Sequence, residues 1–208
     1  MNAKPPSTFR HVFVLGNSRR TLLLLHGTGG NEHDLVSLGR NLDPEASLLS
    51  PRGKVLENGM PRFFRRLAEG VFDEEDLIYR SNELADFISE AATSYSLDAR
   101  KIYAVGYSNG ANIAASLLLL RPSVLTGAAL LRAMVPLVPA VLPELNGISI
   151  LLLSGRSDPL VPEENARQLA ALLTKAGAAV ALHFENAGHQ LTEHTLAATR
   201  QWLAQQPS

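Results

Sequence analysis

The sequence predicts an α/β fold in which a mostly parallel central sheet carries helices on both faces. Short apolar runs alternate along the 208 residues with longer segments of helical period, a pattern typical of parallel strands joined by crossover helices. The chain is 46% hydrophobic and 19% charged, which is enough apolar material for a sizeable core. No repeat, linker or low-complexity tract divides the chain, so we expect residues 1–208 to form one domain.

Seven strands are expected along the chain. His11–Leu15 and Thr21–His26 flank the residues Gly16-Asn17-Ser18, whose composition predicts a hairpin-like turn between the two strands. Ile148–Ser154 is a continuous apolar run, which indicates a strand covered on both faces of the sheet. The other expected strands are shorter β-prone runs, namely Ser47–Ser50, Lys101–Val105, Gly127–Leu131 and Val180–Phe184.

Helices are expected between these strands. Asp76–Tyr95 repeats apolar residues at helical spacing, and Pro162–Ala176 begins with Pro followed by two glutamates and ends before Gly177. Arg52–Glu75 shows no clear period, and a connection of this length in a compact domain is often a functional loop. The remaining expected helices are Asn31–Leu42, Asn109–Leu120 and Gln190–Ala204.

Charge and composition exclude several classes of function. The 19 Lys and Arg nearly balance the 20 Asp and Glu without forming a basic stripe, so no nucleic-acid partner is expected. The absence of cysteine excludes disulfides, thiolate catalysis and cysteine-based metal sites, and we expect neither a metal nor a cofactor. The apolar runs are too short for a membrane span, and Met1–Arg20 lacks the apolar run of a signal peptide. We therefore expect a soluble, cytoplasmic protein without stable membrane insertion.

Ser108 lies at the centre of a Gly-x-Ser-x-Gly motif, Gly106-Tyr107-Ser108-Asn109-Gly110. In the α/β-hydrolase fold this motif forms a sharp turn between a strand and a helix, which exposes the serine hydroxyl as a nucleophile. Five residues alone could match by chance, as an ordinary glycine-rich turn. The apolar run before the motif and the helix-prone run after it favour the nucleophile.

A serine hydroxyl needs an adjacent base, and in this fold the base follows the serine in the chain. Three histidines come after Ser108. His183 lies inside an expected strand and His194 inside the last expected helix. His189 lies between them, at the carboxyl edge of the sheet, where ligands bind in open α/β folds. We therefore favour His189 as the base.

The acid of the triad orients the imidazole and stabilises the imidazolium that forms. Asp158 follows the Ile148–Ser154 strand directly and lies between serine and histidine in the chain order that the fold requires. An aspartate before proline is also a common turn residue. Glu185 is the alternative acid, less favoured because it lies on the same strand end as the predicted base.

The glycine-rich segment His26-Gly27-Thr28-Gly29-Gly30 follows the second expected strand. Acyl transfer passes through an oxyanion that two backbone N–H groups stabilise, and the fold takes them from this loop and from the residue after the nucleophile. This assigns the oxyanion hole to Thr28 and Asn109. A phosphate-binding loop is the alternative, but neither Gly-x-Gly-x-x-Gly nor Gly-Lys-Ser/Thr is present. His26 is expected to order the loop through a backbone hydrogen bond.

Together these motifs resemble the phospholipase/carboxylesterase family, which includes acyl-protein thioesterases. The segment Pro51–Asp76 is similar to the bacterial branch of hydroquinone- or catechol-responsive carboxylesterases. The resemblance implies a capless α/β-hydrolase fold, broad ester hydrolysis, frequent homodimers and, by match, the same triad and oxyanion hole. The motifs that carry it are His26–Glu32, Ser50–Gly53, Gly106–Ala111, Gly155–Pro162 and Gly188-His189.

Two positions depart from the thioesterase branch. That branch has Gly-x-Gly-Asp after the histidine, where this chain has Gly29-Gly30-Asn31, and often has Gln where this chain has Asn109. Backbone donors are unaffected, but a side chain at the mouth of the site differs. The resemblance therefore does not extend to a thioesterase acting on lipidated proteins.

These residues predict a serine carboxylesterase that hydrolyses small, short-acyl or aryl esters through an acyl-enzyme. Thioesterase, lysophospholipase, lactone or amide hydrolysis would use the same triad, and a non-catalytic binding protein of this fold is a further alternative. No insertion long enough for a lid follows Gly127–Leu131. We expect an apolar site with one cationic group at its rim, lined by Arg62, Phe63, Phe64 and Phe72 on one side and by Met134 on the other. Core packing is the alternative role of the phenylalanines.

Overall fold

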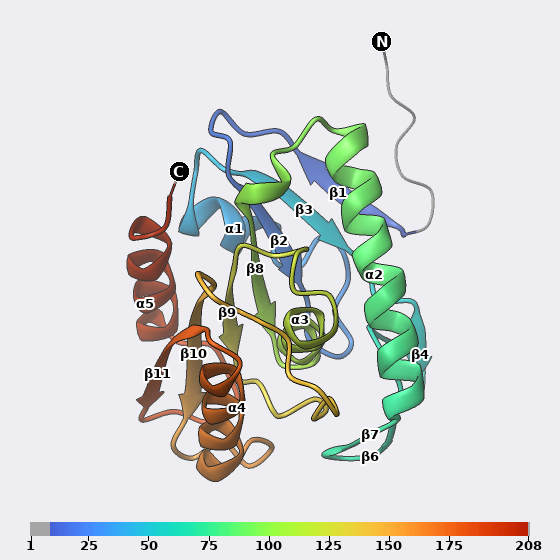
Figure 1. Ribbon diagram of the computed structural model, residues 1–208, viewed down its shortest axis with the longest axis vertical. Helices are drawn as coiled ribbons and strands as arrows, with labels where there is room; N and C mark the ends of the chain where they lie inside the picture. The colour runs from blue at the N-terminus through green and yellow to red at the C-terminus, as the bar shows by residue number, and fades with distance from the viewer. Residues whose placement is uncertain (1–8, 208) are drawn as a thin grey trace.

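The computed structural model describes residues 9–207, so residues 1–8 and Ser208 of the predicted domain lie outside the described residues. A seven-stranded sheet in the order β1-β3-β2-β8-β9-β10-β11 forms the centre (Figure 1). Every neighbouring pair is parallel except β1 with β3, which confirms the mostly parallel sheet. The strands are β1 (His11–Val14), β2 (Thr21–Leu25), β3 (Ser47–Pro51), β8 (Ile102–Tyr107), β9 (Gly127–Leu131), β10 (Ser149–Gly155) and β11 (Ala179–Glu185).

Helices cover both faces of the sheet (Figure 1). The fully buried β2 shows why, because its side chains alternate between two cores. Leu22 and Leu24 pack in a core with residues of α1 and α5, whereas Leu23 and Leu25 pack in a core with residues of α2, α3 and α4. The helices are α1 (Val36–Leu42), α2 (Glu74–Ser94), α3 (Asn109–Leu120), α4 (Glu163–Lys175) and α5 (Glu193–Ala204), with a short 3-10 turn at Ala99–Lys101.

The predicted hairpin between the first two strands is wrong. β3 lies between β1 and β2, pairing antiparallel with the first and parallel with the second. The turn before β2 bonds to the segment before β3, with the N–H groups of Asn17 and Ser18 donating to the Glu45 carbonyl at 2.8 and 2.9 Å. Because β2 is buried throughout and β1 is only half buried, β2 takes an interior place and β1 the edge.

The segment expected as the loop Arg52–Glu75 contains two small antiparallel ribbons. β4 (Val55–Glu57) pairs with β5 (Met60–Arg62), and β6 (Arg66–Ala68) pairs with β7 (Val71–Phe72). The first ribbon turns at Asn58 and Gly59, both with positive φ (51° and 78°), as the tightest hairpin turns require. Short strands of three residues show too little alternation to be predicted from the sequence.

Helix bounds differ from the prediction mainly at their amino-terminal ends. The first helix begins at Val36 instead of Asn31, because the Asn31 side chain accepts from the His33 N–H at 2.9 Å and forms a turn there. Helix α2 begins earlier than expected, at Glu74, where the Asp73 side chain accepts from the Asp76 N–H at 3.0 Å and caps the helix.

The carboxyl ends of the parallel strands meet at one edge of the sheet. The segments that follow β2, β8, β9, β10 and β11 therefore gather there. Between β9 and β10, residues 132–148 form no helix. No helix of the described part of the chain combines the length and the hydropathy that crossing a membrane requires.

Candidate active site

Ser108 lies where β8 turns into α3, with a backbone φ of 53° and ψ of −115°. Positive φ is uncommon and strained for a residue other than glycine. The flanking glycines leave room for the turn. A Cβ on Gly110 would lie 2.0 Å from the carbonyl oxygen of Leu25, and a Cβ on Gly106 would lie 2.5 Å from the carbonyl oxygen of Gly110. The motif is therefore a tight strand-to-helix turn with no space for larger side chains.

Three side chains that the sequence placed in separate segments form one line of hydrogen bonds. Ser108 Oγ lies 2.8 Å from His189 Nε2, and His189 Nδ1 lies 2.8 Å from Asp158 Oδ2. Since the carboxylate only accepts, Nδ1 carries the proton and Nε2 is free to accept from the serine hydroxyl. The other oxygen of the buried Asp158 accepts from the N–H groups of Leu160 and Val161 at 2.9 and 3.2 Å. These bonds fix the carboxylate toward the imidazole.

The alternatives considered for the base and the acid lie elsewhere. His183 is exposed on the edge strand β11, and His194 is exposed in the first turn of α5. Glu185 binds Arg132, Thr192 and Thr195, whereas His189 receives its carboxylate contact from Asp158. Neither His183 nor His194 lines the cavity that contains Ser108.

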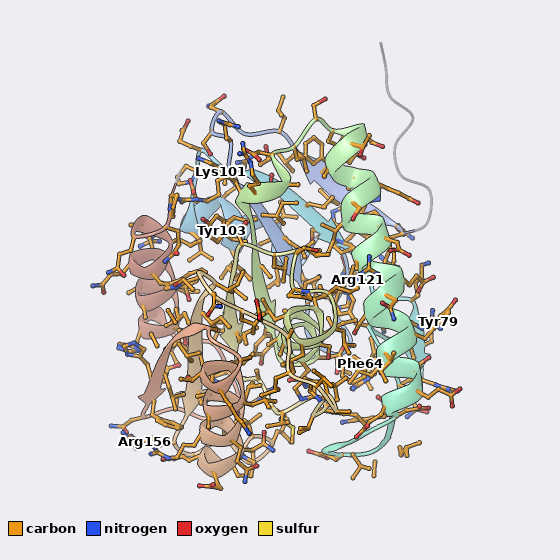
Figure 2. The ribbon with its side chains drawn as sticks, viewed as in Figure 1. Phe64, Tyr79, Lys101, Tyr103, Arg121 and Arg156 are labelled. Carbon is orange, nitrogen blue, oxygen red and sulfur yellow. The ribbon has the colours of Figure 1, made fainter. Side chains whose placement is uncertain are left out.

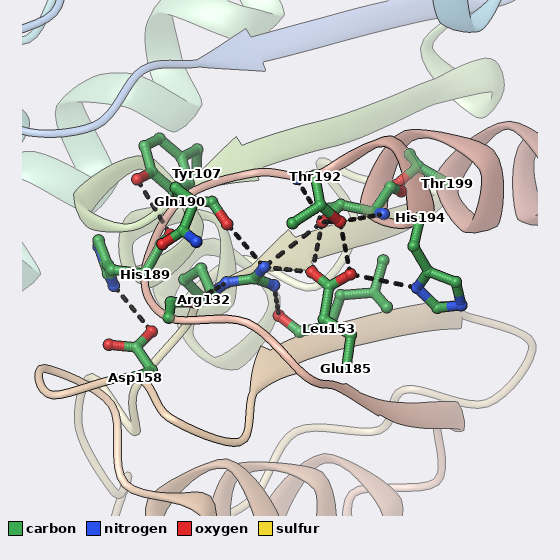
Figure 3. Close-up of polar contacts among 12 residues, drawn as sticks. Tyr107, Arg132, Leu153, Asp158, Glu185, His189, Gln190, Thr192, His194 and Thr199 are labelled. Atoms are coloured by element: carbon green, nitrogen blue, oxygen red, sulfur yellow. Dashed lines mark hydrogen bonds and ion pairs between the residues drawn. The ribbon is translucent and has the colours of Figure 1, made fainter.

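The loop that carries His189 is held by side chains at three consecutive carbonyls (Figure 3). Arg132 donates from Nε to the Gly188 carbonyl at 3.1 Å and from Nη2 to the Gln190 carbonyl at 2.8 Å. Between them, the Tyr107 hydroxyl donates to the His189 carbonyl at 3.1 Å. The backbone on both sides of the imidazole is therefore fixed by Tyr107 at the end of β8 and by Arg132 directly after β9.

Arg132 is fully buried and follows β9 directly, with a positive φ of 61°. Its charge is balanced by an ion pair with Glu185. Burial alone would raise the pKa of Glu185, but hydrogen bonds from Thr192, Thr195 and Arg132 outweigh burial and lower this pKa to about 2. Sequence reasoning missed Arg132. The signal was present, since a lone arginine directly after an apolar strand lies at the same edge as the other candidates.

His26 is buried beside the predicted oxyanion loop and makes two backbone bonds. Its Nε2 accepts from the Gly53 N–H at 3.0 Å, so its Nδ1 carries the proton and donates to the Gly27 carbonyl at 2.7 Å. Burial lowers the pKa of His26, which favours the neutral ring that this pair of bonds requires. The expected ordering of the loop by His26 thus agrees with the geometry.

The end of the first ribbon and the residue after it contact both predicted oxyanion-hole residues. Arg62 Nη1 donates to Thr28 Oγ1 at 2.7 Å, and the Phe63 N–H donates to Asn109 Oδ1 at 2.7 Å. Asn109 is the first residue of α3, so its own N–H has no acceptor within the helix. Thr28 and Asn109 line the same cavity as Ser108. Their roles as backbone donors stay a prediction, now with a geometry that permits them.

A cavity of about 370 Å³ opens over Ser108 and His189. Arg62, Phe72 and Met134 line it as expected, and Arg66 and Arg132 add two cationic side chains that the sequence did not predict there. Phe63 and Phe64 do not line it. Their side chains are 2% and 0% exposed, and both belong to the hydrophobic core. Phe64 packs in the interior near α2, whereas Tyr79, which is part of α2, points outward (Figure 2). The remaining lining residues are Thr28, Glu69, Gly70, Tyr107, Asn109, Asn112, Leu160 and Val161.

This arrangement is suited to acyl transfer. A serine hydroxyl, an imidazole and a carboxylate form one line of hydrogen bonds, which is the arrangement that acyl transfer uses, and the two predicted oxyanion-hole residues line the same cavity. Within residues 9–207 no group of three or more His, Asp or Glu side chains is placed to bind a metal ion.

Replacing Glu185 tests how far the His189 loop depends on its buried ion pair. Glu185→Gln leaves the Arg132 cation buried without its counter-charge, so we expect a loss of about 3 kcal/mol in the free energy of unfolding near neutral pH. The wild-type carboxylate contributes its stability above the usual pKa of 4.5 and loses it as the pH falls toward about 2. The stability gap should therefore shrink on acidification.

The measurement is denaturant unfolding of both proteins from about pH 6 to about pH 3. Glu90→Gln removes a carboxylate exposed on α2 and is the matched control, for which we expect the wild-type profile. A gap for Glu185→Gln that stays constant over this range would contradict the role given to the ion pair.

Comparison with known proteins gives one consistent result. The Phospholipase/Carboxylesterase family matches residues 15–206. The chain is 52% identical over 193 residues to MhqD of Bacillus subtilis (strain 168), and the match covers 93% of this chain and 96% of MhqD. A carboxylesterase structure from Bacillus cereus matches with a TM-score of 0.92 and 52% identity, over 94% of this chain and 93% of that one. YahD, solved with malic acid, matches with a TM-score of 0.89 and 32% identity, over 94% and 98%.

The family match at residues 15–206 includes every strand of the central sheet except the edge strand β1, together with the glycine-rich turns and the segment that bears His189. The matches confirm the resemblance drawn from the motifs. The chain belongs to the phospholipase/carboxylesterase family of the α/β-hydrolase fold and is a hydrolase.

Proposed function

We propose that this protein is a serine carboxylesterase that hydrolyses small esters with short acyl or aryl groups. The observation that carries the proposal is the line from Ser108 through His189 to Asp158, with 2.8 Å at each step. Such a line activates a hydroxyl that is otherwise a weak nucleophile at neutral pH. The Bacillus cereus carboxylesterase, at 52% identity, supports ester substrates.

The proposed reaction has two steps. His189 Nε2 takes the proton of Ser108, whose Oγ forms a bond to the ester carbonyl carbon, and the Thr28 and Asn109 N–H groups stabilise the oxyanion. The ester C–O bond then breaks, and the imidazolium returns the proton to the leaving alkoxide. Water attacks the acyl-enzyme with His189 again as base, which releases the acid and restores the Ser108 hydroxyl.

Two features support a small substrate. The cavity of about 370 Å³ lies under loops without a helical lid, since residues 132–148 form no helix. YahD, a relative with 32% identity, was solved with malic acid, which is a small ligand. A long acyl chain would extend from this cavity into water and gain no burial there.

Ser108→Ala should lower kcat by about 10⁴- to 10⁶-fold on a short aryl ester, because the nucleophile is removed while the fold remains. The measurement is initial-rate kinetics alongside thermal unfolding. Ser157→Ala, a change at an exposed serine next to Asp158, is the matched control and should keep wild-type kinetics. Full activity in Ser108→Ala would sink the assignment of the nucleophile.

Acyl-chain length tests the substrate class. Each methylene that enters the cavity adds about 0.8 kcal/mol of apolar burial, whereas methylenes beyond it add none. With 4-nitrophenyl esters kept below their micellar concentrations, we expect kcat/KM to be highest between C2 and C6. A preference for C12 to C16 chains would show that the substrate class is wrong.

A further inference from the structure

Two arginines lie on one wall of the cavity that contains Ser108. Arg62 ends β5 and Arg66 begins β6, and both line the cavity. The Arg62 side chain is only 4% exposed. Its Nε donates to the Phe64 carbonyl at 3.2 Å and its Nη1 to Thr28 Oγ1 at 2.7 Å. Among residues 9–207, Nη2 of Arg62 and both terminal nitrogens of Arg66 have no bonding partner, which leaves them as donors for a ligand.

The two cations share a single carboxylate. Glu57 Oε2 lies 3.3 Å from Arg62 Nη1, and Glu57 Oε1 lies 2.9 Å from Arg66 Nε. This group of three side chains therefore carries about one positive charge in excess. Burial lowers the pKa of Arg62, and the Arg66 cation lowers it further by more than Glu57 restores.

The other charged groups of the wall do not cancel this excess. Arg132 is balanced by its ion pair with Glu185. Glu69 is the one acidic side chain among the lining residues, and it is exposed, where water screens its charge. The two free terminal nitrogens of Arg66 present a fork that matches the two oxygens of a carboxylate, and the free Nη2 of the buried Arg62 adds a further charged donor.

The cavity lining also has an apolar part, which consists of Phe72, Met134, Leu160 and Val161. An ester with an anionic arm and a short apolar body would complement both parts. The bond from Arg62 to Thr28 also joins the cationic wall directly to the predicted oxyanion hole.

We propose that the site selects esters bearing a carboxylate, which Arg62 and Arg66 bind while the scissile carbonyl lies at Ser108. This selectivity rests on the proposed esterase function, and it names the substrate class of that site. It also replaces the expectation of one cationic group at the rim with a two-arginine anion subsite.

Two matched ester pairs test the proposal. Methyl hydrogen succinate and methyl succinamate differ by a charge in the acyl part, and 3-acetoxybenzoate and 3-acetoxybenzamide differ by a charge in the leaving group. For each pair, kcat/KM of the carboxylate divided by kcat/KM of the amide is measured in the full-length enzyme. Arg66→Gln is the variant, because Arg66 is partly exposed and its replacement leaves the Arg62 bond to Thr28 in place.

Arg65→Gln is the matched control. It removes the same charge one residue away, but Arg65 lies outside the cavity lining and pairs with Asp73 and Asp76 at 3.0 and 3.6 Å. Wild type should prefer the carboxylate by about tenfold in at least one pair, because a charged hydrogen bond contributes that much. Arg66→Gln should remove most of the preference, Arg66→Lys should retain part of it, and Arg65→Gln should retain all of it.

The outcomes separate the two proposals. Two results overturn the anion subsite and leave the esterase proposal standing. The first is a wild-type kcat/KM for the carboxamide ester that equals or exceeds that for the carboxylate ester in both pairs. The second is a carboxylate preference that Arg66→Gln retains in full. Failure of wild type to hydrolyse any of the four esters or a short aryl ester overturns the esterase proposal, and the subsite with it.

Discussion

The close approach of β2 and the start of α3 is the constraint on which the candidate site depends. The Leu25 carbonyl occupies the space that a Cβ on Gly110 would need, and Gly110 in turn limits Gly106. Only glycine at both positions lets the chain turn at Ser108 with its positive φ. The same turn makes Asn109 the first residue of α3, so one backbone geometry exposes the serine hydroxyl and leaves a helix N–H unpaired beside it.

Each loop at the carboxyl edge of the sheet is then fixed by a buried polar side chain. His26 joins the Gly27 carbonyl to the Gly53 N–H, Asp158 accepts two N–H groups of its own loop, and Arg132 binds the carbonyls on both sides of His189. Buried polar groups that are fully paired give a rigid and unique arrangement, whereas unpaired ones destabilise it. The geometry of the candidate triad therefore depends on the hydrogen bonds of buried side chains outside the triad as well as on the three residues themselves.

The sequence predicted the sheet class and the strand ends that bear the candidate residues, because β-prone runs and glycine motifs are local signals. It could not predict that β3 lies between β1 and β2, since strand order depends on which strand is buried on both faces. The ribbons of the Arg52–Glu75 segment were missed because their strands are two or three residues long. Phe63 and Phe64 were assigned to the cavity on composition alone, but a phenylalanine signals burial and not a particular surface. Arg132 was missed because the partner of its charge, Glu185, lies 53 residues further along the chain.

Covalent labelling with a fluorophosphonate, followed by peptide mapping by mass spectrometry, tests the central claim most directly. Such a probe reacts with a serine that an adjacent histidine has activated, and it does not require the natural ester to be known. The geometry predicts a single adduct, on the peptide that contains Ser108, and loss of that adduct when Asp158 or His189 is replaced by alanine. An unlabelled protein, or an adduct on a serine other than Ser108, would contradict the account.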